Sequence, residues 1–183
     1  MKNIDAVIEV LGNLKNLKRT GWVRNNVTDA ESVADHTFGT AFLVLMFAPE
    51  HLNLEKCLKL ALIHDLAEIY VGDITPFDGV DEKEKQKQEM AVMNLLEEKL
   101  NFPNLVALFY EYEQAETPEA RFVRNIDKLE SAFQAVFYYQ HQKIEKGTAL
   151  EFLDTAQRRS LLNSHDDEFL VLYNQLRQFV ENN

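Results

Sequence analysis

The chain has 183 residues, 46% of them hydrophobic, only six glycines and four prolines, and a formal net charge of −11. This length and composition fit one compact domain rich in regular structure and exclude a disordered chain. The negative charge argues against a nucleic-acid polymer as partner, because a phosphate backbone requires a basic surface. No run approaches the roughly eighteen apolar residues of a membrane span, and the N-terminus lacks the apolar core of a signal peptide. The single cysteine, Cys57, can form no disulfide within the chain, so we expect a cytoplasmic protein.

The N-terminal part of the chain shows two helical patterns separated by a polar segment. Apolar residues recur at three- and four-residue spacing from Ile4, which predicts a helix that ends near Leu17. Residues 18–31 contain glycine, asparagine and aspartate and are predicted to form a loop. Ser32 stands three residues before an aspartate, which is the spacing of a capping box, and predicts a second helix that runs to about Ala48.

Two further helices are predicted in the middle of the chain. Asn53 is placed to cap a third helix, which we expect to run through His64 to about Tyr70 and to stop at Gly72. The sequence GDITPFDGV that follows is typical of a turn-rich loop. A fourth helix is predicted over 81–100, where a run of charges at the start forms a solvated face.

The longest predicted helix lies in the C-terminal half. Pro103 opens a shorter helix through Tyr112, and the pair Thr117-Pro118 supplies a cap and a first helical residue. The helix that starts there is expected to continue to about Lys146.

The remaining segment is predicted to hold two more helices. Gly147 is expected to end the longest helix, Thr148 to cap the next one, and Ser164 to cap a last helix that ends near Val180. No segment shows sustained alternation of apolar and polar residues, and no linker is long enough to divide the chain. We therefore predict a single-domain, all-α helical bundle over residues 1–183.

Side chains of the kinds that bind metals stand in three of these helices, each among apolar residues. His64 and Asp65 are neighbours in the third helix, and Glu68 follows within one turn. His36 lies in the first turn of the second helix, and Asp127 interrupts an apolar stretch of the longest one. Imidazoles and carboxylates are ligands of divalent metals, and burying them without partners is costly. Three helices are therefore expected to bring ligand-type residues to a common core.

The order H…HD…D, formed by His36, His64-Asp65 and Asp127, resembles that of the HD-domain metal-dependent phosphohydrolases. Further segments are similar to the 5'-deoxynucleotidase branch of that family: RTGWV at 19–23, ESVADH at 31–36, ALIHDLAEIYVGDITP at 61–76, the acidic-basic helix start at 82–88 and ARFVRNIDKLE at 120–130. The resemblance covers residues 4–145, and the C-terminal helices over 148–183 carry no matched motif.

The resemblance implies an HD-type helical bundle that holds one divalent ion in four ligands: His36, His64, Asp65 and Asp127. Mn, Co, Fe, Ni and Zn all suit two imidazoles and two carboxylates, so the sequence does not identify the metal. Glu68 is implied to orient or deprotonate the attacking water. Asp73 is implied to complete the site, or to help bind a second ion together with Glu68 and the backbone of Ile74.

The RTGWV match implies that Arg19 and Trp22 receive the substrate. The planar fork of an arginine suits the oxygens of a phosphate, and an indole ring suits the face of a nucleobase or a sugar. From composition alone, Trp22 could equally be an ordinary core aromatic. The resemblance also implies a homodimer.

We therefore expect an enzyme that hydrolyses deoxyribonucleoside 5'-monophosphates to deoxyribonucleoside and phosphate. Two alternatives stay open: the same site acting on another small phosphate ester or anhydride, and a non-catalytic binding module with a structural metal. Residues 66–126 contain no histidine, which disfavours the histidine-rich two-metal site of cyclic-nucleotide phosphodiesterases in the same superfamily. Glu68 and Asp73 are carboxylates that a structural metal site does not need, which favours catalysis.

Overall fold

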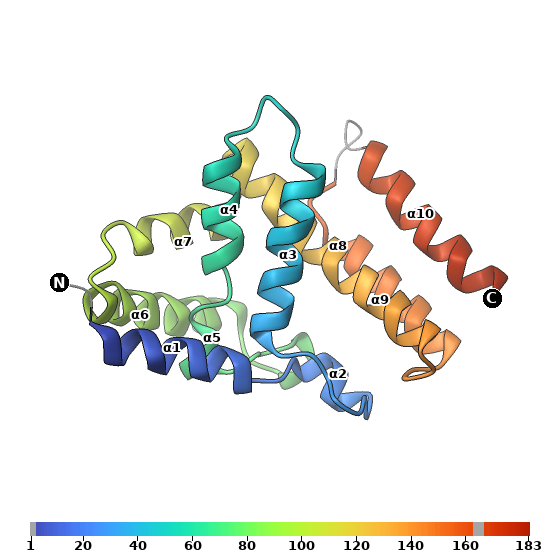
Figure 1. Cartoon of the computed structure of the whole chain (residues 1–183), viewed down its shortest axis with the longest axis horizontal. Coiled ribbons are helices and arrows are strands. Elements are labelled where there is room, and N and C mark those ends of the chain that lie inside the picture. Colours follow the sequence, from blue (N-terminus) through green and yellow to red (C-terminus); the bar gives the residue numbers. More distant parts are fainter. Residues whose placement is uncertain (1–2, 163–166) are drawn as a thin grey trace.

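A computed structural model describes residues 3–162 and 167–183, and within these ranges the protein consists of helices and no β-strand (Figure 1). The elements in chain order are α1 (Ile4–Asn16), α2 (Thr20–Arg24), α3 (Val33–Phe47), α4 (Leu54–Ile63), α5 (Glu68–Val71), the 3-10 helix η1 (Pro76–Asp78), α6 (Glu82–Leu100), α7 (Leu105–Gln114), α8 (Pro118–Gln140), α9 (Lys146–Arg159) and α10 (Asp167–Asn182). The predicted all-α fold is confirmed. None of the described helices combines the length and the apolar character that a membrane crossing requires.

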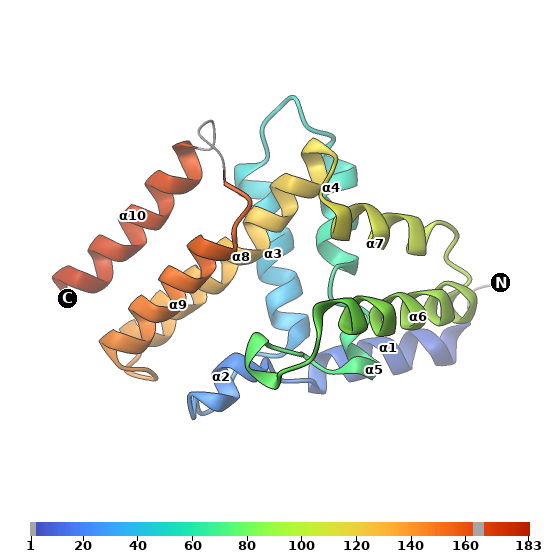
Figure 2. The ribbon, with the colours of Figure 1, turned by 180° about the vertical axis from the view of Figure 1, so that it is seen from behind.

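The long helix α8 organises the bundle. It contacts α3, α4, α7, α9 and α10, and Figures 1 and 2 show α9 and α10 along one part of it and α7 near its start. The side chain of Thr117 caps α8 by accepting a hydrogen bond from the Ala120 N–H, as predicted. One apolar cluster joins α8 to α3, α4, α9 and α10, and a second joins α1, α6 and α7 to the end of α4. The segments that carry the predicted ligands lie where these two clusters meet.

The start of α3 confirms the predicted capping box. Ser32 Oγ accepts a hydrogen bond from the Asp35 N–H at 3.1 Å, and the Asp35 carboxylate accepts one from the Ser32 N–H at 2.8 Å. This reciprocal cap fixes the first turn of the helix. As a consequence His36, one residue further on, points inward and is fully buried.

The predicted third helix is interrupted at the histidine-aspartate pair. Helix α4 ends at Ile63 and α5 begins only at Glu68, with tight turns between them. His64 Nδ1 lies 2.7 Å from the Ala61 carbonyl oxygen. In a continuing α-helix, this oxygen would accept a hydrogen bond from the Asp65 N–H instead. The backbone bonds that follow connect residues three apart, including that from the Glu68 N–H to the Asp65 carbonyl.

Other boundaries also differ from the predictions. The expected loop over 18–31 contains the short helix α2, and α7 begins at Leu105 and ends at Gln114, two residues later at each end than expected. Helix α8 ends at Gln140, before the predicted Lys146, because Gln142 has a left-handed backbone with φ of 54°. Gly147 and Thr148 therefore lie in the first turn of α9. The expected cap at Ser164 lies outside the described residues.

Candidate active site

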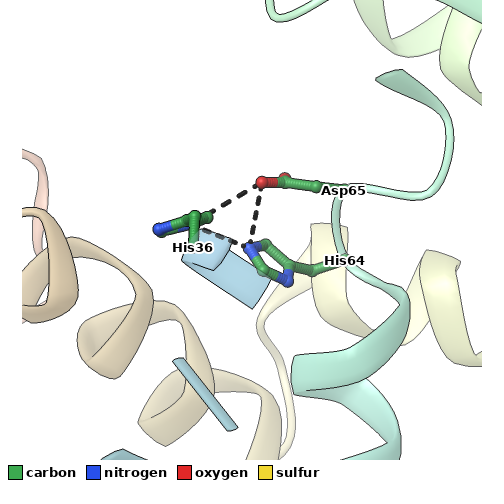
Figure 3. Close-up of side chains that lie close together, drawn as sticks. All are labelled: His36, His64 and Asp65. Atoms are coloured by element: carbon green, nitrogen blue, oxygen red, sulfur yellow. Dashed lines mark hydrogen bonds and ion pairs between the residues drawn. The ribbon is translucent and has the colours of Figure 1, made fainter. Parts of the chain in front are cut away.

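The four predicted metal ligands converge from three segments of the chain. The Nε2 atoms of His36 and His64 are 3.3 Å apart, and Asp65 Oδ2 lies 3.2 Å from the second and 3.6 Å from the first, as Figure 3 shows. Asp127 Oδ1 lies 3.2 Å from His36 Nε2 and 4.0 Å from His64 Nε2. The donor atoms of His36, His64 and Asp65 all lie within 4.8 Å of one another, and Asp127 adjoins both histidines. Two imidazoles and two carboxylates are a donor set that divalent transition metals accept.

The outer nitrogen of each histidine is held by a specific partner. His36 Nδ1 lies 2.5 Å from Glu130 Oε2, and His64 Nδ1 lies 2.7 Å from the Ala61 carbonyl oxygen. When each Nδ1 carries a proton and donates it to its partner, each Nε2 presents a lone pair to the shared point. Without a metal, burial and Arg19 lower the pKa of His36, but Glu130 and Asp127 raise it to about 10, so the carboxylates around this ring attract positive charge, whether from a proton or from a metal ion.

The two aspartates are held as anions. Burial alone would raise the pKa of Asp65, but the charge of His64 and its other neighbours outweigh burial and hold that pKa well below its usual range. For Asp127, burial is outweighed by Lys128 and both histidines, and its pKa is also well below the usual range. Asp127 Oδ2 accepts hydrogen bonds from the Tyr112 hydroxyl at 2.7 Å and from Lys128 Nζ at 2.6 Å. These bonds leave Oδ1 turned toward the histidines.

Glu68 is buried, and one of its carboxylate oxygens has no hydrogen-bond partner among the described residues. It is 5% exposed, and its Oε2 atom is paired with no other described residue. Burial raises its pKa well above the usual range, and the nearby negative charges of Asp65 and Asp73 raise it further. A buried polar atom without a partner costs on the order of 1 to 3 kcal/mol, so its retention points to a ligand, ion or water at this position.

Asp73 and Arg19 form a bridge between α2 and the loop after α5. Asp73 Oδ2 accepts a hydrogen bond from the Thr20 N–H at 2.5 Å, and Asp73 Oδ1 lies 3.8 Å from Arg19 Nη1. Arg19 Nη1 also lies 3.5 Å from Asp65 Oδ2, so the guanidinium faces the cluster of proposed ligands. The N–H of Ile74 donates to the Gly72 carbonyl at 3.0 Å, and the backbone group of Ile74 that could bind a cation is its carbonyl oxygen.

The indole of Trp22 is enclosed by aromatic side chains. It is 2% exposed, stacks on Phe152 with ring centroids 4.0 Å apart and meets the ring of Tyr138 edge-on at 5.0 Å. Its Nε1–H donates to Glu31 Oε1 at 2.7 Å. A contact with substrate would require the ring to leave this packing. In the described arrangement Trp22 fastens α2 to α8 and α9 and so fixes the position of Arg19.

Two functional candidates, Glu130 and Gly39, were missed by the reasoning from sequence. Glu130 supports His36 from α8, and Gly39 lies where that carboxylate crosses α3: a Cβ atom at Gly39 would be 2.6 Å from Glu130 Oε1. A signal was present for both. Glu130 follows Asp127 by one helical turn and closes the motif ARFVRNIDKLE, and Gly39 interrupts a helix one turn after His36.

The fold is an all-helical bundle, and separate segments of it bring together a histidine, a histidine-aspartate pair and an aspartate. This combination defines the class of protein. The sequence matches the HD domain family over residues 11–166, and the chain belongs to that family.

Curated relatives and solved structures agree with this assignment. The chain is 39% identical over 158 residues to the 5'-deoxynucleotidase HDDC2 of Bos taurus, across 84% of this chain and 76% of the relative. It is 36% identical to the 5'-deoxynucleotidase HDDC2 of Danio rerio, across 97% and 88%. Among solved structures, the PH0347 protein of Pyrococcus horikoshii OT3 is similar with a TM-score of 0.75 and 32% identity, across 96% of this chain and 99% of that one.

Proposed function

We propose that this protein is a metal-dependent 5'-deoxynucleotidase that hydrolyses deoxyribonucleoside 5'-monophosphates. The observation that carries the proposal is the unpartnered, buried carboxylate of Glu68 beside a cluster of two histidines and two aspartates. A structural metal site would need no such group. The substrate class is supported by relatives that are named 5'-deoxynucleotidases and are 36 to 39% identical to this chain.

The proposed metal ligands are the four residues of the cluster: His36, His64, Asp65 and Asp127. A divalent ion held there would supply Lewis acidity toward a phosphoryl oxygen and would lower the pKa of the attacking water. The donor set suits Mn, Co, Fe, Ni or Zn. If a second ion binds, Glu68, Asp73 and the carbonyl of Ile74 are its proposed ligands.

Glu68 is the proposed general base. Burial and the charges of Asp65 and Asp73 raise its pKa, and a raised pKa makes a carboxylate a stronger proton acceptor. Glu68 takes a proton from water as the water oxygen forms a bond to phosphorus. The bond between phosphorus and the 5' oxygen breaks, and that oxygen receives the proton that Glu68 took up and leaves as the hydroxyl group of the deoxyribonucleoside.

Arg19 is the proposed binding group for the phosphate. Its charge is secured because Asp73 and Asp65 raise its pKa above the usual range despite burial. Asp73 holds the guanidinium toward the site and is proposed to act with Glu68 in catalysis. The expected contact of Trp22 with substrate stays a prediction. The enclosed ring supports a different role for Trp22, which is to position Arg19.

Release of inorganic phosphate tests this proposal. The protein is stripped with a chelator, reloaded with single metals and assayed on dAMP, AMP, dATP and a cyclic nucleotide. We expect phosphate from dAMP and no turnover after chelation. If the protein released phosphate faster from another ester or from an anhydride than from dAMP, that compound would replace deoxyribonucleoside monophosphates as the proposed substrate class. If loaded protein hydrolysed none of them and unfolded on metal removal, the site would be structural.

We also propose that two copies of the chain associate through α3. Four large apolar side chains form an exposed row on this helix, with Phe38 72% exposed: Phe38, Phe42, Leu45 and Met46. Such a row favours an interface over free solvent. Light scattering after size exclusion should give a dimer for the wild type and a monomer for Phe42→Glu. The control Ile8→Glu, at an exposed apolar position on α1, should remain a dimer.

A cytoplasmic location is likewise proposed. It is supported by the buried free thiol of Cys57, since a reducing compartment keeps such a thiol reduced.

A further inference from the structure

Two charged residues of α6 turn inward within a helix start that is otherwise solvated. The side chain of Lys85 is 21% exposed and that of Glu89 is 9% exposed, whereas the side chain of Lys87 between them is 80% exposed. A lysine and a glutamate side chain cost free energy when they leave water, so an inward pair needs a physical reason.

The inward face of α6 leads to the candidate active site. Lys85, Glu89 and Met93 are spaced four residues apart and therefore share one side of the helix. Met93 is fully buried in the cluster that contains Leu66 and Ala67, the two residues between Asp65 and Glu68. Helix α6 also contacts α5. The face of α6 that carries Lys85 thus packs against the segment that supplies the proposed ligand Asp65 and the proposed base Glu68.

The charge of Lys85 is coupled to that of the site. Burial lowers the pKa of Lys85, but Glu89, Glu68 and Asp65 together raise it above the usual value. Burial is the main cause that raises the pKa of Glu89, and Asp65 raises it further, so both members of the pair lie within electrostatic range of the proposed ligand.

Lys85 is held loosely and keeps its hydrogen-bonding capacity. Its Nζ atom lies 3.5 Å from Glu89 Oε1, longer than the about 2.7 to 2.9 Å of a charge-assisted hydrogen bond, and it donates no hydrogen bond to another described residue. Lys128 offers a contrast, because its Nζ atom is bound at 2.6 Å to Asp127 Oδ2. The ammonium of Lys85 therefore has donors free for a ligand.

We propose that Lys85 binds the phosphate group of the substrate from the α6 side of the site, while Arg19 binds it from the α2 side. Figures 1 and 2 show α2 and α6 on different sides of the end of α4 that leads into α5. The inference rests on the proposed function. A phosphate monoester brings about two negative charges to a site lined with carboxylates, so it requires cations from more than one direction. Glu89 holds Lys85 near this position.

The test uses inorganic phosphate as the probe and metal-loaded full-length protein. Isothermal titration gives the phosphate affinity, and steady-state assays on dAMP give KM and kcat. We expect Lys85→Gln to weaken phosphate binding by about tenfold or more and to raise KM more than it lowers kcat. Lys85→Arg should recover much of the loss. The matched control Lys87→Gln, two residues away on the exposed face, should behave as the wild type.

The double variant Lys85→Gln/Glu89→Gln separates binding from a purely structural role. If Lys85 only neutralised Glu89, removal of both charges would restore phosphate affinity, and that result would overturn the inference. Unchanged affinity in Lys85→Gln, or failure of the wild type to bind phosphate, would overturn it as well. A wild type that binds phosphate through Lys85 but hydrolyses no nucleotide would refute the proposed function and leave this inference standing.

Discussion

The two sides of the candidate site differ in how completely their polar groups are paired. On the α3 and α8 side, Glu130 holds His36, and Tyr112 and Lys128 hold Asp127. On the α5 side, Glu68 has a buried oxygen that no other described residue pairs with. Pairing fixes a side chain in one position and lowers the free energy of the folded state, and a missing pair leaves capacity for a ligand. This contrast is expected if the paired residues hold the proposed metal and Glu68 acts on water and substrate.

The largest expected effect comes from removing the unpaired group. Glu68→Ala should lower kcat by about 10² to 10⁴, because the proposed general base is lost. The metal content should stay near that of the wild type, since the four proposed metal ligands keep their partners. Phosphate release and elemental analysis on the same preparation measure both quantities. Near-normal turnover would remove Glu68 from the mechanism and erase the distinction between the two sides.

Breaking the paired side should weaken metal binding instead. Glu130→Ala removes the partner of His36 Nδ1, and loss of such an outer partner typically weakens metal affinity by about 10- to 100-fold. Gly39→Ala should act in the same direction, because its new Cβ would displace the Glu130 carboxylate. Competition with a coloured chelator measures the affinity. Turnover at saturating metal should recover in both variants, and a loss of kcat that excess metal did not repair would contradict this division of roles.

A smaller effect is expected at Trp22, where stability and substrate binding can be separated. Trp22→Phe keeps an aromatic ring beside Phe152 but leaves the buried Glu31 oxygen without its donor. We expect the free energy of unfolding to fall by about 1 to 3 kcal/mol in denaturant titrations. KM for dAMP should change little. A large rise in KM with unchanged stability would instead support direct contact with the substrate.

The mildest effect concerns the pH dependence of stability. Burial raises the pKa of Glu89 from 4.5 to about 7, so between these pH values the folded state binds a proton that the unfolded state releases. Glu89 therefore favours folding below pH 4.5, and this contribution is lost as the pH rises through about 7. Glu89→Gln should flatten the fall in stability across that window. Thermal unfolding of both proteins at several pH values measures it, and parallel curves would show that the carboxyl group titrates normally.

Much of the architecture could be predicted because local chemistry decides it. The capping box at Ser32 sets the register of α3 and hence the direction of His36, and Thr117 with Pro118 sets the start of α8. Periodicity then places Asp127 on the buried side of α8. The ligand-type residues could be proposed from sequence for this reason.

The features that were missed depend on contacts between distant segments. In the sequence, Glu130 cannot be told from a solvent-exposed charge, because its contact with His36 forms only when α3 packs against α8. Lys85 is one of several lysines in a charged run. The burial of Trp22 depends on Phe152 from α9, 130 residues further along the chain. The break after α4 arises because the His64 ring bonds to the Ala61 carbonyl, and no periodicity of apolar residues reveals such a bond.

The short distance between the two members of the dipeptide has a geometric consequence. His64 keeps a helical backbone, with φ of −59° and ψ of −35°. Even so, His64 Nε2 and Asp65 Oδ2 lie 3.2 Å from each other. Two consecutive residues thereby become a local chelating unit that requires no closure of a long chain loop. Half of the proposed coordination sphere is thus encoded in a single peptide unit, and the rest of the fold has only to deliver His36 and Asp127 to it.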